Sequence, residues 1–226
     1  AAPPFSAAAA AAGGSAAAAT GADEPGLPEA RRILKELMAL VQWARGGRAR
    51  QVWIHYCGVG ANQAVVLGGE AATDESGVAM VPIDVAERGV ITNEVFGAVL
   101  RSLPEDCACF VVLDCCHAGS LVDLPFMCDR DKGARKALTA PPPAVRIHLL
   151  ASSRDHSSDA KVYGASNRAQ WSGVLTAMLL HCLRAEQTWG QLLEDVRALI
   201  CRGKKPVLPI LSSTAPLDLS SETRLV

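Results

Sequence analysis

Apolar residues recur along this chain at two spacings, one typical of helices and the other of strands. Pro28 suits a first helical turn, and the apolar positions that follow it at helical spacing run up to a Gly-Gly pair. These positions are Ile33, Leu37, Leu40 and Val41. Apolar runs rich in β-branched residues alternate with the helical segments and predict strands. The predicted strands cover residues 51–56, 78–83, 108–114, 145–151 and 207–211.

Three further helices are predicted from caps and apolar spacing. Thr92 is a suitable N-cap for a helix that ends at Pro104, and residues 174–183 form a second apolar helical run. Thr188 and Gln191 have the spacing of a capping box ahead of the last helix. Strands alternate with helices, and the central strand shows no polar alternation. We therefore predict an α/β fold with a mainly parallel central sheet and helices on both faces.

Composition divides the chain into a short lead-in and one domain. Residues 1–22 are mostly Ala, Gly, Ser and Pro without charge, so they cannot bury enough surface to offset their ordering entropy and are predicted to be disordered. Residues 23–226 have the length of a single domain. With 22 basic and 23 acidic residues, the chain has no charge excess for a nucleic-acid partner. No apolar stretch reaches the roughly 20 residues that span a bilayer, which excludes a membrane segment.

The eight cysteines are expected to be thiols. Several of them lie inside apolar strand or helix runs, where a free cysteine behaves as a small hydrophobe. The Ala-rich start lacks the basic and strongly apolar regions of a signal peptide, which favours a reducing, cytoplasmic location.

Candidate chemistry gathers at the end of the central strand. The strand predicted for residues 108–114 ends in Asp114, and Cys115, Cys116 and His117 follow it. Open α/β sheets carry their reactive groups at the carboxyl ends of their strands. A cysteine thiolate is a nucleophile, provided that a base or a positive field stabilises it. A zinc site is disfavoured because adjacent strand cysteines point to opposite faces, whereas structural zinc needs paired ligands two to four residues apart. A cysteine-rich core strand with a purely structural turn is the other alternative.

Two motifs resemble those of metacaspases, the caspase-like cysteine endopeptidases of plants, fungi, protists and bacteria. Residues 114–119, Asp-Cys-Cys-His-Ala-Gly, resemble the family motif Asp-x-Cys-His-(Ser or Ala)-Gly. Residues 56–60, Tyr-Cys-Gly-Val-Gly, resemble Tyr-Ser-Gly-His-Gly, with Val59 where the family has its catalytic histidine. A dinucleotide loop is disfavoured at these glycines because no third glycine and no helix follow. The resemblance implies that His55 and His117 are structural, since family members often carry histidine at these positions as well.

The resemblance assigns roles to individual residues. It implies that Cys116 is the nucleophile and that backbone amides near Gly58 and Cys116 stabilise the oxyanion. It also implies a substrate pocket that selects Arg or Lys. The residues of that pocket are Asp114, Cys57 and Asp155.

The resemblance further implies a weak calcium site. The positions that match the family's oxygen ligands are Asp74, Asn93, Glu94 and Asp123. Asn93 and Glu94 replace a double aspartate, and amide and glutamate oxygens can still bind calcium. The alternative is that these residues are solvated loop side chains.

The resemblance implies a caspase-like three-layer sandwich with the subunit order of type I metacaspases. A large-subunit part covers residues 27–127, an exposed joining loop residues 128–144, and a small-subunit part residues 145–226. The loop carries the basic residues expected to be cleaved, Lys132, Arg135 and Lys136. The family's N-terminal strand has no counterpart in the Ala-rich start, which would leave an open sheet edge.

These features predict a metacaspase-family cysteine endopeptidase homologue that cleaves peptides or proteins after Arg or Lys. Loss of the base from such a catalytic unit typically costs about 10³ to 10⁶ in rate, so we expect weak activity. The alternative is an inactive pseudo-peptidase that binds peptides or regulates an active metacaspase.

Overall fold

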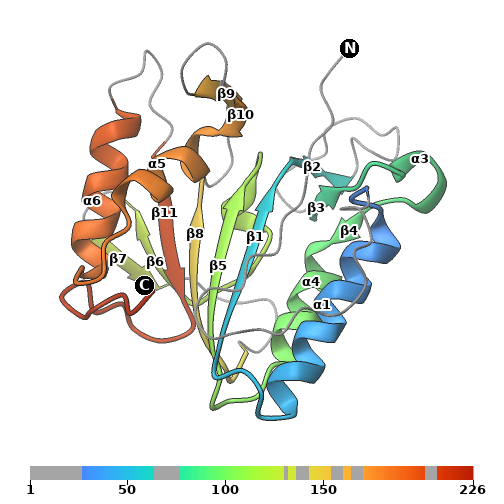
Figure 1. Cartoon of the computed structure of the whole chain (residues 1–226), viewed down its shortest axis with the longest axis horizontal. Coiled ribbons are helices and arrows are strands. Elements are labelled where there is room, and N and C mark those ends of the chain that lie inside the picture. The colour runs from blue at the N-terminus through green and yellow to red at the C-terminus, as the bar shows by residue number, and fades with distance from the viewer. Residues whose placement is uncertain are drawn as a thin grey trace.

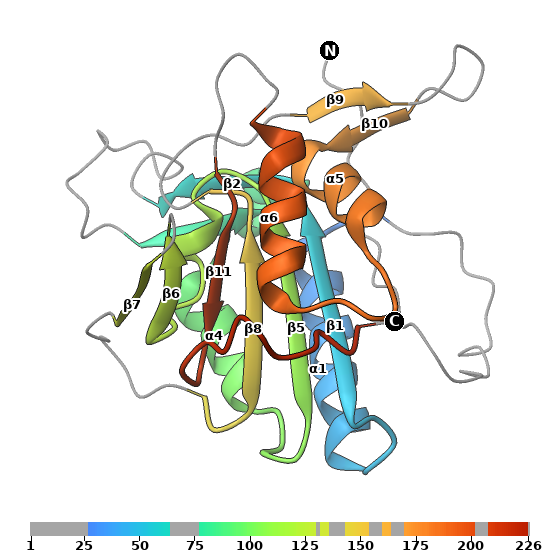
Figure 2. The same ribbon diagram turned by 90° about the vertical axis from the view of Figure 1, so that its left-hand side faces the viewer.

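A mixed β-sheet with helices on both faces forms the centre of the molecule (Figures 1 and 2). The computed structural model describes residues 27–63, 77–129, 132–135, 143–153, 160–163, 170–201 and 208–225. The sheet has six strands in the order β1 (Gln51–Cys57), β5 (Ala108–Asp114), β8 (Arg146–Ala151), β11 (Ile210–Ser213), β6 (Phe126–Asp129) and β7 (Lys132–Arg135).

The strand directions confirm the predicted fold class. Strands β1, β5 and β8 pair in parallel, whereas β11 is antiparallel to both β8 and β6, and β7 is antiparallel to β6. Four of the six strands, β1, β5, β8 and β6, therefore run in one direction. The carboxyl ends of these four strands lie at the same end of the sheet, and the candidate residues lie at that end.

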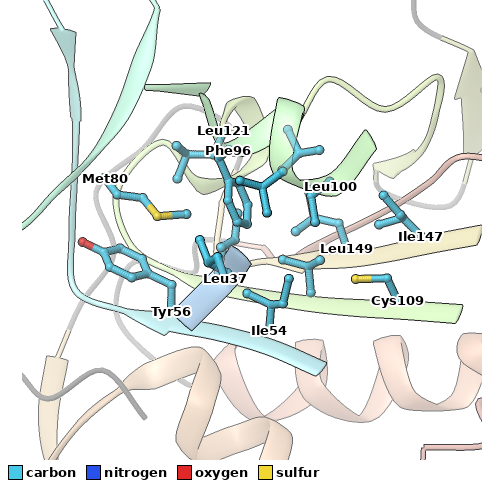
Figure 3. Close-up of a cluster of buried hydrophobic side chains, with 14 of the residues drawn as sticks. Leu37, Ile54, Tyr56, Met80, Phe96, Leu100, Cys109, Leu121, Ile147 and Leu149 are labelled. Atoms are coloured by element: carbon cyan, nitrogen blue, oxygen red, sulfur yellow. The ribbon is translucent and has the colours of Figure 1, made fainter. Parts of the chain in front are cut away.

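Each face of the sheet has its own apolar core. Helices α1 (Ala30–Arg45) and α4 (Asn93–Arg101) cover one face, and α5 (Val174–Cys182) and α6 (Trp189–Ile200) cover the other (Figures 1 and 2). Figure 3 shows the first core, in which Leu37 of α1 and Phe96 of α4 meet Ile54 of β1. The second core includes Phe110, Leu175 and Leu192. The alternation along β1 assigns its even-numbered residues to the first core.

Both predicted helix caps are present. The Thr92 hydroxyl accepts a hydrogen bond from the Val95 amide at the start of α4. At α6, the Gln191 amide donates to the Thr188 hydroxyl and the Thr188 amide donates to the Gln191 side chain, which completes a capping box.

Smaller elements surround the carboxyl edge of the sheet. One three-stranded sheet has the order β2 (Val59–Asn62), β3 (Val78–Val81) and β4 (Ile91–Thr92), and a hairpin pairs β9 (Ala160–Tyr163) with β10 (Gln170–Gly173). A short helix α3 (Val85–Arg88) and a 3₁₀ turn η1 (Ala118–Ser120) complete the described elements. The pattern of apolar residues predicted β3 but neither β2 nor the β9–β10 hairpin.

The joining segment differs from the loop predicted for residues 128–144. Cys128 and Asp129 end strand β6, and residues 132–135 form β7, which pairs with β6 as a hairpin. The prediction of a loop was wrong for these strand residues because backbone pairing needs no apolar pattern in the added strand. The strand predicted for residues 207–211 is observed as β11 at Ile210–Ser213, and it lies between β8 and β6.

Strand β1 is one of the two edge strands of the six-stranded sheet, next to β5. Among the described residues, no strand pairs with its outer edge. None of the helices in the described ranges is long and apolar enough to cross a membrane.

Candidate active site

Parallel pairing of β1 with β5 brings the two sequence motifs together. The register places Cys57 opposite Asp114 at the last rung of the pair. One residue further, the Gly58 amide donates a hydrogen bond to the Asp114 carbonyl at 3.3 Å. The Gly58 amide proposed for the oxyanion site is thus directed at β5 in this structure, which leaves the amides of the Cys116 turn as the alternative donors.

Gly60 of β2 packs against the nucleophile turn, residues 115–120 after β5, which carries Cys116. A Cβ atom at Gly60 would overlap the carbonyl oxygen of Cys116 and lie 3.1 Å from the Cys115 sulfur. Only glycine permits this approach of two backbones. The contact fixes position 59, the preceding residue, at the edge of the turn that carries Cys116.

The turn after β5 separates the two adjacent cysteines. Cys115 is fully buried, whereas Cys116 is partly exposed. Burial raises the pKa of the Cys115 thiol, with a further contribution from the charge of Asp114, so this thiol stays protonated. His117 adopts a left-handed conformation with φ of 56°, which reverses the chain directly after Cys116. Cys116 is therefore the accessible sulfur of the pair.

The end of β8 supports this turn. The Ser152 hydroxyl donates to the Cys115 carbonyl at 2.7 Å, and the Gly119 amide donates to the Ser153 carbonyl at 2.8 Å. Both serines are buried. Their support of the nucleophile turn could not be inferred without the β5–β8 register.

Val59 occupies the position of the missing histidine. Val59 is 43% exposed, and its carbonyl accepts a hydrogen bond of 2.9 Å from the Tyr56 hydroxyl. Burial raises the pKa of Tyr56, so the hydroxyl remains a donor at neutral pH. The backbone of this position is thus held in place, while its side chain has no group that can accept or donate a proton.

Neither His55 nor His148 replaces this base. His55 lies 3.0 Å from the Thr176 hydroxyl through Nε2, and burial lowers its pKa, although the charge of Asp114 opposes that shift. His148 stacks on Trp189 with ring centroids 4.3 Å apart, and burial lowers its pKa to about 4. Both imidazoles are neutral at pH 7 and take part in packing below α5 and α6.

Two of the residues proposed for the substrate pocket, Asp114 and Cys57, lie near the start of α5. Asp114 is only 2% exposed, and its Oδ2 accepts hydrogen bonds from the amide and the hydroxyl of Thr176. Cys57 is half-buried, and burial raises the pKa of its thiol, with a further contribution from the charge of Asp114. Asp155, the third proposed member, lies outside the described residues.

The structure describes three of the four expected calcium ligands. The Asn93 side-chain oxygen accepts a hydrogen bond from the Gln63 amide at 3.2 Å, so one of the expected ligand atoms already has a hydrogen-bond donor. Within the part of the chain that the structure describes, no group of three or more acidic, histidine or cysteine residues is arranged to hold a metal. Glu94 and Asp123 are described, and Asp74 lies outside the described residues.

The proposed cleavage residues fall partly in a strand. Lys132 and Arg135 are the first and last residues of β7, and Lys136 lies outside the described residues. The sequence interpretation missed the contacts made by Thr176, Gly173 and Gln63. The only available signal was the Gly-Val-Leu-Thr start of α5, which resembles a family pattern but does not reveal its partner on β5.

Comparisons with known proteins agree with this geometry. A sequence model of the metacaspase peptidase C14 domain matches residues 16–125, which include both motifs. Metacaspase-3 of Trypanosoma cruzi is 22% identical over 216 residues, which are 89% of this chain and 59% of that protein. Metacaspase-1 of Arabidopsis thaliana is 29% identical over 111 residues, which are 48% of this chain and 29% of that protein. The chain thus spans less than two thirds of these relatives.

A solved structure shows the same architecture. The crystal structure of protein GSU0716 from Geobacter sulfurreducens covers 87% of this chain and 78% of its own, with a TM-score of 0.56 and 14% sequence identity. This likeness concerns the fold alone. The match to the metacaspase peptidase C14 domain and the similarity to the metacaspase relatives, with the paired motifs at the ends of β1 and β5, support a metacaspase-family protein.

Proposed function

We propose that this chain is a weak cysteine endopeptidase in which Cys116 attacks peptide bonds that follow Arg or Lys. The contact between Gly60 and the Cys116 carbonyl carries the proposal, because it sets position 59 beside the nucleophile turn. The nucleophile and the turn are present, but the side chain at that position is valine.

The chemistry explains the expected weakness. Acyl transfer to Cys116 requires that the thiol lose its proton and that a proton reach the leaving amine. An imidazole performs both transfers in a Cys-His pair, whereas Val59 can perform neither. Solvent must then carry these protons, and the loss of the base typically costs about 10³ to 10⁶ in rate.

A pseudo-peptidase is the second candidate function. The exposed apolar side chain of Val59 favours it, since a group that cannot exchange protons has replaced the base at an otherwise intact turn. Such a protein would bind a basic peptide segment, or an active metacaspase, without cleaving it. The two functions differ in whether Cys116 can be acylated or alkylated from a bound peptide.

Covalent labelling separates the two functions. Peptidyl chloromethyl ketones that end in Arg or Lys are expected to modify Cys116 slowly, and to modify it faster than a matched ketone that ends in Asp. Peptide mapping should find Cys57 and Cys115 unmodified, because burial raises the pKa of both thiols. Cys116→Ala should abolish labelling.

The opposite result supports the pseudo-peptidase. If the ketones leave Cys116 unmodified while a fluorescent Arg-ending peptide still binds reversibly, the chain binds peptides without a reactive nucleophile. If small iodoacetamide also fails to modify Cys116 in the folded protein, the sulfur is not accessible and the endopeptidase proposal is wrong.

We also propose that an active metacaspase cleaves the segment that follows β6. Its basic residues are Lys132, Arg135 and Lys136. The pairing of β7 with β6 must open before a protease can bind Lys132 or Arg135 in extended form. Lys136, which follows β7 in the sequence, is therefore the favoured position.

Calcium is expected to stabilise the chain only slightly. Since the Asn93 oxygen is engaged by Gln63, we propose a dissociation constant of about 1 mM or weaker. At about 1 mM calcium, binding then adds no more than about 0.4 kcal/mol to the free energy of unfolding. Differential scanning fluorimetry should show a rise in Tm of at most about 2 °C, which Asp123→Ala removes. A rise of about 5 °C or more would contradict the weak site.

A further inference from the structure

Arg197 of α6 joins the ends of two strands through its guanidinium group. Its Nε and Nη2 atoms both donate to the Pro209 carbonyl, at 3.1 and 2.9 Å, and Nη2 also donates to the Cys128 carbonyl at 3.1 Å. Pro209 directly precedes β11, and Cys128 is the last residue but one of β6. One side chain therefore ties α6 to the start of β11 and to the carboxyl end of β6.

These contacts go beyond the usual role of a basic residue near a helix end. Arg197 lies in the last turn of α6, where a cation interacts favourably with the helix dipole without needing a fixed partner. Its three hydrogen bonds, however, all go to carbonyl oxygens of other elements. Hydrogen bonds from a charged, half-buried group are stronger than those from a neutral donor. Arg197 therefore holds two strand ends in place in addition to its place in the helix.

The Cys128 carbonyl lies at the entry to the segment that carries the proposed cleavage residues. In the β6–β7 hairpin, Cys128 pairs with Gly133, and Asp129 pairs with Lys132. On its other side, β6 pairs with β11, where Cys128 lies opposite Leu211. The bond from Arg197 thus holds β6 within one residue of its end.

Cuts at different positions in this segment make different demands on that bond. A protease binds its substrate in extended form, so the residues on both sides of the cut must first leave the sheet. Lys132 lies four positions after Cys128, so a cut after Lys132 requires that the end of β6 also separate from β11 and Arg197. Arg135 is the last residue of β7 and Lys136 follows it, so a cut there requires only that β7 leave β6.

We propose that Arg197 is a positioning residue that directs cleavage of the joining segment to its far side, after Arg135 or Lys136, by holding the end of β6 in the sheet. Cys128 precedes all of these cuts and Arg197 follows them, so the same bond links the two fragments once the segment is cut. This inference rests on the proposed function only where the protease is an active metacaspase. The bond itself does not depend on whether Cys116 is catalytic.

Limited digestion with trypsin tests the inference, since trypsin also cuts after Arg and Lys. The folded chain is digested under native conditions, and mass spectrometry follows the rate of cutting after Lys132 and the summed rate after Arg135 and Lys136. Arg197→Met keeps much of the apolar stem of the side chain but has no donor. It should accelerate the cut after Lys132 by at least about tenfold and the later cuts by less than about threefold, because the rates follow the populations of the opened forms.

Two further variants serve as controls. Arg184→Ala removes another arginine, one that forms an ion pair with Asp195 of α6 at 3.3 Å, and should leave both cutting rates unchanged. Arg197→Lys keeps the charge and a donor but lacks the fixed fork of the guanidinium, so its cutting rates should lie between those of the unsubstituted chain and Arg197→Met. Should Arg197→Met not fold, Arg197→Lys provides the same comparison.

The ratio of the rate after Lys132 to the summed rate after Arg135 and Lys136 decides the inference. The inference is supported if this ratio rises by at least about threefold in Arg197→Met. It is wrong if the ratio stays the same, because equal acceleration would reflect a general loss of stability and unchanged rates would mean that Arg197 does not hold β6. If an active metacaspase fails to cut the segment, the proposed cleavage is wrong, yet the ratio obtained with trypsin still decides whether Arg197 holds the end of β6.

Discussion

Val59→His is expected to raise the turnover of Arg- or Lys-ending fluorogenic peptides by at least about tenfold, which corresponds to about 1.4 kcal/mol of activation free energy. The backbone at position 59 is already fixed on both sides. The Tyr56 hydroxyl holds the Val59 carbonyl, and Gly60 packs against the carbonyl of Cys116. An imidazole at this partly exposed position supplies the proton acceptor and donor that valine lacks.

The measurement is the initial rate of peptide hydrolysis for folded, matched preparations. Cys116→Ala in the Val59→His background should remove the gain, which would show that the new activity uses the proposed nucleophile. Val59→Phe is the control for side-chain size, since it adds a ring without a nitrogen and should give no gain. Robust hydrolysis by the unsubstituted chain that depends on Cys116 would show that another base serves.

A silent Val59→His variant with an unchanged fold would also be informative. It would mean that the two motifs are adjacent but that the cleft cannot bind a peptide in a reactive position. The open outer edge of β1, next to Cys57 and Gly58, is then the feature to examine first, because no described strand covers it. The labelling experiment with small and peptidyl electrophiles distinguishes this outcome from an unreactive Cys116.

The apolar pattern predicted the elements whose burial dictates their sequence. Strand β5 begins and ends at the predicted residues because both of its faces are covered, so nearly every position must be apolar. Helices α4 and α6 were located from their caps, Thr92 and Thr188, whose local hydrogen bonds depend on residues three positions away. In contrast, the strand Lys132–Arg135 has no such pattern, so apolar spacing could not predict its pairing with β6.

The candidate site shows the same division between local and distant information. The motifs fixed the positions of Cys116 and Val59, since each follows a recognisable strand. The contact between Asp114 and Thr176 was not predictable, because Thr176 lies 62 positions further along the chain and reaches Asp114 only through the packing of α5 on the sheet. The amide pair of Gln63 and Asn93 was missed for a similar reason, since it spans the 30 positions between β2 and α4.

Gly60→Ala is expected to lower the free energy of unfolding by about 3 kcal/mol, because the added methyl group overlaps the backbone carbonyl of Cys116. Neither partner can move as a side chain could, so β2 or the nucleophile turn must shift. For a chain of this length, the loss corresponds to a fall in Tm of about 6 to 12 °C. The same shift should alter the rate at which electrophiles modify Cys116.

Gly97→Ala provides the matched control, since it makes the same chemical change at a glycine in helix α4. The nearest atom to a Cβ there is the end of the flexible Arg101 side chain, at 3.2 Å, and alanine has the higher helix propensity. This variant should keep or raise Tm and leave the labelling of Cys116 unchanged. If Gly60→Ala proves as stable as Gly97→Ala and labels at the original rate, β2 does not pack against the nucleophile turn, and position 59 is not placed to supply a base.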